Sequence, residues 1–106
     1  NLSQKKADLI IDIPTAYEIK TEKVEKTIAK ILDEAKKIKG VYSESKYIGI
    51  SKLDDNAVNY TLSIICKQDN QWQIKRDILR IIKTTYEKDK IKKPYQQIEV
   101  HTNERL

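Results

Sequence analysis

The sequence contains no methionine, and it has only one cysteine and one histidine. Because Cys66 stands alone, no disulfide can form within the chain, and Cys66 with His101 cannot complete a zinc site of Cys and His ligands in one copy. Gly40 and Gly49 are isolated, so the chain lacks the glycine-rich loop that cradles a phosphate. We therefore predict no cofactor and no metal. A chain without methionine also lacks its own initiator residue, and we expect it to be part of a longer protein.

Long apolar runs are missing as well. No stretch approaches the ~18–20 apolar residues that cross a bilayer, and the N-terminus has none of the regions of a signal peptide. With 106 residues and 39% hydrophobic content, the chain suits one compact domain with a modest core. We divide it into a loose lead-in at residues 1–6, a globular domain at 7–93 and an extended tail at 94–106.

The charge of the chain is positive but evenly spread. Its formal net charge is +5, and 18 of its 21 basic residues are lysines interleaved with Asp and Glu. This pattern is typical of solvated helix faces. A cluster at Lys88–Lys93 surrounds a predicted helix end, where cations complement the helix dipole. An RNA-binding module of similar topology needs several aromatics on its third strand, and Asn59–Ile64 has one. We predict no nucleic-acid partner.

The first half of the chain predicts a strand and a helix. Residues 7–14 place Leu9, Ile11 and Ile13 on one face at period two. A helix is predicted over 21–39, with Thr21 as its N-cap and Gly40 as its left-handed C-cap. Its apolar stripe consists of Val24, Ile28, Ile31, Leu32, Ala35 and Ile38.

The second half predicts a hairpin, a helix and a last strand. The hairpin strands are 46–53 and 57–67, joined by Asp54–Asn56. A second helix over 70–88 begins with an apparent capping box of Asn70 and Gln73, and we interpret Trp72 as a core anchor. The apolar face of this helix is formed by Trp72, Ile74, Ile78, Leu79, Ile81, Ile82 and Tyr86.

Pro94 separates the second helix from the last strand. Proline fixes its own φ and pushes the preceding residue out of the helical region, so the chain leaves Lys93 in extended form. The closing strand is then Gln97–His101. The order strand–helix–strand–strand–helix–strand predicts an α+β fold, a ferredoxin-like βαββαβ sandwich with both helices on one face of a mainly antiparallel sheet.

Particular residues at the joints of these elements resemble a known family. The most specific segment is Ile91–Val100, which is similar to an Ile-x-x-Pro-Tyr-Pro-Gln joint leading into a terminal strand, with Gln96 in place of the second proline. The chain resembles the C-terminal cytoplasmic domain of the small-conductance mechanosensitive ion channel (MscS) family. The other segments that carry this resemblance are Ile11–Tyr17, Thr21–Glu25, Val58–Lys67 and Arg76–Lys83.

The resemblance implies a function as well as a fold. It implies that the chain is no enzyme, and that it belongs to a homo-oligomer, a heptamer in this family, with a hollow cage on the cytoplasmic side of the cell membrane. Membrane helices would lie upstream of this chain, and ions and small solutes would pass through the assembly. We expect the tail to pair between subunits as a barrel strand. The expected interface residues are Pro94, Tyr95, Gln97, Ile98 and Val100.

Other interpretations of single residues are weaker. Cys66 follows the apolar face of its strand and is interpreted as a small buried hydrophobe, and no sequence signature supports a catalytic dyad with His101. Asp54 and Asp55 are typical of turn chemistry rather than of acid–base catalysis. The alternative function is a soluble ferredoxin-like regulatory or effector-binding domain, since such domains also lack catalytic motifs. The sequence upstream of Asn1 would distinguish the two.

Overall fold

The structure, a computed structural model, describes residues 5–94. It contains three strands, two α-helices and one short 3-10 turn. In chain order these are β1 (Lys6–Ala16), α1 (Thr21–Lys36), β2 (Lys46–Leu53), β3 (Ala57–Lys67), η1 (Gln68–Asn70) and α2 (Gln71–Asp89).

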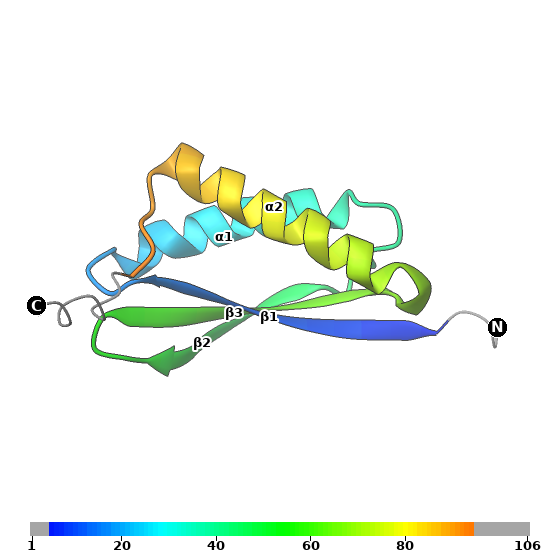
Figure 1. The fold of residues 1–106 in the computed structure, drawn as a ribbon, viewed down its shortest axis with the longest axis horizontal. Helices are drawn as coiled ribbons and strands as arrows, with labels where there is room; N and C mark the ends of the chain where they lie inside the picture. The colour runs from blue at the N-terminus through cyan, green and yellow to red at the C-terminus, as the bar shows by residue number, and fades with distance from the viewer. Residues whose placement is uncertain (1–4, 95–106) are drawn as a thin grey trace, which may run out of the picture.

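The three strands form one sheet in the order β1-β3-β2, and both pairs of neighbours are antiparallel. Figure 1 shows α1 and α2 lying together on one face of this sheet. The predicted α+β class, with both helices on the same face, is confirmed. The predicted fourth strand, Gln97–His101, lies outside the described residues. Within residues 5–94, neither helix is long and apolar enough to cross a membrane.

The core lies between the sheet and the two helices. β3 is the central strand, and its residues at even positions from Val58 to Cys66 are buried on the helix side. On β1, Ile11 and Ile13 are buried on the same side, and Leu9 packs against the core edge. Side chains of a strand point alternately to the two faces, so the alternation predicted for both strands is confirmed.

The hairpin between β2 and β3 has the predicted bounds. Its loop is closed by a hydrogen bond from the Asp54 amide to the Ala57 carbonyl, at 2.8 Å. β2 is less regular, because its register against β3 shifts twice, between Tyr47 and Gly49 and between Ile50 and Lys52. Such bulges bend and twist an edge strand and interrupt its ladder.

The predicted cap of α1 is wrong by one residue. The first bond of the helix runs from the Val24 amide to the Lys20 carbonyl, so Lys20 is the N-cap and Thr21 is already helical. α1 ends at Lys36 rather than Lys39. Gly40 has φ +99°, but it lies in the turn beyond the helix. There its carbonyl accepts the Lys67 amide, and a Cβ would stand 3.2 Å from Cδ1 of Ile74.

The predictions for the start of α2 are also wrong in detail. Asn70 is the N-cap, yet its side chain caps no amide. Gln73 donates to Asp77, one turn further along the helix, instead of reaching back. Trp72 is 64% exposed rather than a core anchor. It lies two positions from Ile74, which corresponds to about 200° around a helix, so it points away from the buried row that begins there.

The two apolar residues Ile78 and Trp72 therefore test the packing of α2. Ile78 is fully buried, and Ile78→Ala should lower the free energy of unfolding by about 2–4 kcal/mol through lost burial and a cavity. Trp72→Ala, the matched control, should change it by less than about 1 kcal/mol. Urea unfolding followed by circular dichroism measures both, and equal losses would show that Trp72 packs in the core.

Candidate functional site

The segment that follows α2 is the part of the domain where the tail begins, and its backbone is held firmly. Lys90 takes the left-handed conformation, with φ 59° and ψ 43°. Its amide bonds the Glu87 carbonyl at 3.2 Å, and the Ile91 amide bonds the Tyr86 carbonyl at 2.9 Å. This pair of bonds is the Schellman arrangement that ends many helices, here with Lys where Gly is usual.

Two further contacts fix the exit against the sheet. Ile91 is buried and belongs to the core cluster, as expected of the apolar residue after such a cap. The Lys92 carbonyl then accepts a hydrogen bond from the Ala16 amide at 3.0 Å. The end of β1 and the chain after α2 therefore lie side by side, although they are far apart in the sequence (Figure 1).

A buried polar pair lies just beneath this exit. The Thr15 hydroxyl and the Tyr86 hydroxyl lie 2.8 Å apart, and both side chains are buried. Burial raises the pKa of the Tyr86 phenol, and the hydrogen bond with Thr15 opposes that rise. Each hydroxyl supplies the partner that a buried polar group needs, so the pair joins the end of α2 to β1 without leaving an unsatisfied group.

Asp89 connects the last turn of α2 to α1. Its carboxylate accepts a hydrogen bond from the Thr27 hydroxyl at 2.6 Å and pairs with the Lys30 ammonium at 3.0 Å. The Thr27 bond, followed by the Lys30 bond, lowers the pKa of the Asp89 carboxyl. Because Thr27 is buried, the pair fixes how the two helices meet where the tail begins.

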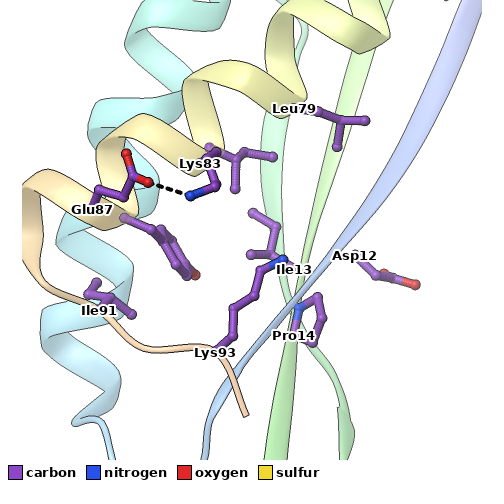
Figure 2. A pocket seen from close by; sticks show the side chains of 10 residues that line it. Asp12, Ile13, Pro14, Leu79, Lys83, Glu87, Ile91 and Lys93 are labelled. Carbon is purple, nitrogen blue, oxygen red and sulfur yellow. Dashed lines mark hydrogen bonds and ion pairs between the residues drawn. The ribbon is translucent and has the colours of Figure 1, made fainter. Parts of the chain in front are cut away.

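A groove of about 460 Å³ lies between α2 and β1 beside the exit. Its apolar wall includes Ile13, Leu79 and Ile91, and an ion pair between Lys83 and Glu87 lies at its rim (Figure 2). Figure 2 also shows the Lys93 side chain running along β1 beside Pro14. The polar part of its lining comes from Asp12, Lys83, Tyr86, Glu87 and Lys93.

Only one of the five predicted interface residues lies among the described residues. Pro94 lines a shallow hollow together with the hairpin loop from Leu53 to Ala57. The chain thus crosses the end of the sheet toward the β2–β3 hairpin. The remaining four, Tyr95, Gln97, Ile98 and Val100, lie outside the described residues.

The described residues offer little for catalysis or metal binding. Cys66 is fully buried, as predicted, and burial raises the pKa of its thiol. A protonated, inaccessible thiol is a poor nucleophile. Between Lys5 and Pro94, no group of three or more His, Cys, Asp or Glu side chains is arranged to hold a metal ion.

Sequence reasoning missed a set of polar contacts on the sheet face away from the helices. Ser63 donates to Asp8 and Thr61 donates to Asp12, each at 2.6 Å, and Thr61 also lies 2.8 Å from the Ser51 hydroxyl. Alternation along each strand hinted that these residues share a face, but only the pairing of β1 with β3 brings them together. They stabilise the strand pairing and suggest no catalytic site.

The fold and its firmly held exit define a class: an α+β domain that delivers a C-terminal extension from one end of its sheet. The family model described as "Mechanosensitive ion channel MscS, C-terminal" matches residues 9–92. Because this match covers most of the chain, the chain belongs to the family of C-terminal domains of MscS mechanosensitive ion channels. It is a family of channel domains, not of enzymes.

A solved structure agrees with this assignment. The chain is similar to Helicobacter pylori MscS in its closed state, with a TM-score of 0.73 and 17% sequence identity. The alignment covers 86% of this chain and 36% of the H. pylori chain, so this chain spans about a third of that protein. At this identity the likeness shows the fold. A comparison with curated proteins gives no significant match.

The left-handed Lys90 predicts a stabilising substitution. A non-glycine residue in this conformation costs about 1 kcal/mol, so Lys90→Gly should raise the free energy of unfolding by about 0.5–1 kcal/mol. Lys88→Gly, two residues earlier in the helix, is the matched control and should lower it by about 0.5–1 kcal/mol. Thermal unfolding distinguishes the two, and destabilisation by both variants would contradict this account of the cap.

Asp89 predicts a pH dependence. Its pKa is lowered in the folded state from the ordinary value of 3.8, so its contribution is present above that value and is lost as the pH falls through the lowered pKa. Asp89→Asn should cost about 1–2 kcal/mol at pH 7, and the difference from the parent should shrink below pH 3.8. Asp55→Asn, in the exposed hairpin loop, is the control and should have little effect at either pH. A pH-independent cost for Asp89→Asn would show that its charge is irrelevant.

Proposed function

We propose that this chain is the cytoplasmic C-terminal domain of an MscS-like mechanosensitive channel. In that channel it forms part of the wall of a cage that holds the subunits together and filters solutes on their way to the pore. The match of the family model to residues 9–92 carries this proposal. The proposal gives the domain no catalytic role.

The proposal places the chain within a larger assembly. The parent protein is a homo-oligomer, a heptamer, with membrane helices upstream of this domain and with the domain on the cytoplasmic side of the cell membrane. Ions and small solutes pass through the assembly, and no nucleic acid takes part. Part of the lysine surface is neutralised locally, because Lys6 pairs with Glu44, Lys30 with Asp89 and Lys37 with Glu34.

The proposed role of the tail is to join subunits. Pro94, Tyr95, Gln97, Ile98 and Val100 form the proposed interface, in which strands from several subunits pair around the symmetry axis. The held exit supports this role: Ile91 is buried in the core and Lys92 is bonded to Ala16, so the direction of departure is fixed by the folded domain. A strand alone in water exposes unpaired amides and carbonyls, and closure into a ring satisfies them.

Truncation of the full-length protein tests this role. A protein that ends after Lys93 should lose subunits in detergent, because the proposed interface is gone, whereas a control that ends after Thr102 keeps the strand and should keep its assembly. Native mass spectrometry measures the subunit number of each. Equal subunit number and equal resistance to dissociation in both proteins would show that the tail does not join the subunits. A soluble full-length protein would favour the alternative function, a regulatory or effector-binding domain.

A further inference from the structure

The outer edge of β1 has a defined hydrogen-bonding pattern. Just beyond the two ends of the β1–β3 ladder, the Tyr17 amide bonds the Asn56 carbonyl and the Gln68 amide bonds the Lys5 carbonyl. In an antiparallel pair the hydrogen-bonded positions alternate, so the odd-numbered residues of β1 face β3. The even-numbered residues direct their backbone groups to the other side, where the structure describes no neighbouring strand. The Ala16 bond to Lys92 follows this rule.

That bond also fixes how the tail would align if it continued along β1. The chain leaves α2 next to the end of β1, in the position from which a fourth strand would run back antiparallel beside it. In antiparallel pairing, the next hydrogen-bonded pair lies two residues further along each strand. The partner of Ala16 is Lys92, so the next pair would be Pro14 with Pro94.

This next pair has no hydrogen-bond donor. Proline lacks a backbone N–H, so neither member of a Pro14–Pro94 pair donates, and the position would contain no hydrogen bond. These are the only two prolines of the chain. In the structure, Pro94 lines a hollow together with the hairpin loop from Leu53 to Ala57.

The same alignment would place polar residues of the tail on the helix side of the sheet. Directly opposed residues lie on the same face of a sheet, and Pro14 lies on the face away from the helices. Gln97 and Glu99 would then lie on the helix side, over the groove whose walls include Leu79 and Ile82. Ile98 would lie beside the exposed Ile10, and Tyr95 would lie on the helix side beside Ile13, so the tail would bring apolar and polar side chains to both faces.

We propose that Pro14 and Pro94 form a paired stop that keeps the C-terminal tail off the edge of its own β1. Each proline removes the donor that its opposite residue needs, so the bond between Ala16 and Lys92 is followed by a position without hydrogen bonds, and a ladder along β1 is weakened where it would begin. Edge strands commonly carry proline to prevent unwanted pairing. Under the proposed function, on which this step rests, the stop leaves the tail available to another subunit.

Amide hydrogen exchange of the 106-residue chain, measured by NMR, tests the stop. Pro14→Val with Pro94→Val restores both donors, and the tail should then pair with β1. The Asp12 and Ile10 amides should exchange at least about tenfold more slowly than in the parent, the effect of one added hydrogen bond. Each single variant restores one donor and should give a smaller change. The Leu62 amide, in the core, reports that every variant is folded.

Removal of the tail identifies the source of the protection. Pro14→Val in a chain that ends after Lys93 should lose the slow exchange at Asp12 and Ile10. Protection that survives this truncation comes from another partner and overturns the proposal. The proposal is also overturned if the Asp12 and Ile10 amides exchange equally slowly in the parent and in the double variant. It is overturned as well if these amides exchange in the folded double variant as fast as they do in the parent. The two proposals can fail separately. Slow exchange in the double variant supports the paired stop, even if the truncated full-length protein assembles normally and the tail therefore does not join subunits.

Discussion

The burial of one face of β3 is the constraint on which the rest of the structure depends. β3 is the central strand, and its side chains at Tyr60, Leu62 and Ile64 are almost completely removed from water. Each buried side chain of this size contributes about 1.5–3 kcal/mol relative to exposure. A one-residue slip of β3 would turn this whole set outward. The register against β1 is therefore strongly specified, and with it every contact made by the outer edge of β1.

The exit from α2 inherits this rigidity. Tyr86 reaches β1 through Thr15, Asp89 reaches α1 through Thr27, and the Lys92 carbonyl reaches Ala16. These contacts join the end of α2 to the sheet and to the neighbouring helix. Under the proposed function, the departure point of the tail needs to be fixed before assembly, since ordering it later would cost conformational entropy. The strained Lys90 is tolerated because Ile91 is buried immediately after it.

Sequence reasoning predicted the elements well, because periodicity reports which face of an element is buried. The hairpin bounds and the single helix layer follow from the alternation in β3 and from the stripes of α1 and α2. The predicted caps at Thr21 and Gly40 are wrong, and Asn70 is the N-cap of α2 without the predicted capping box. Caps depend on the direction from which the chain arrives, and that direction is set by tertiary packing. Trp72 was misassigned because its aromatic character outweighed its position on the helix. Trp72 lies two positions before Ile74, which places it on the face of α2 that points away from the core. The spacing in the sequence already indicates this.

The sequence predicted where the chain leaves the second helix, but not the backbone contacts that hold it there. Pro94 marked the end of the helix in the sequence, yet nothing in the pattern connected it to Pro14, because their relation depends on the bond between Ala16 and Lys92. An edge strand with open donors attracts any extended segment nearby, and the segment tethered nearest to the end of β1 is the chain that follows Lys92. Local concentration in a tethered segment reaches the millimolar range, so self-pairing competes with pairing between subunits by default. A subunit that assembles through its tail must therefore weaken the intramolecular alternative, and the removal of donors from both sides of one position does so without changing the core.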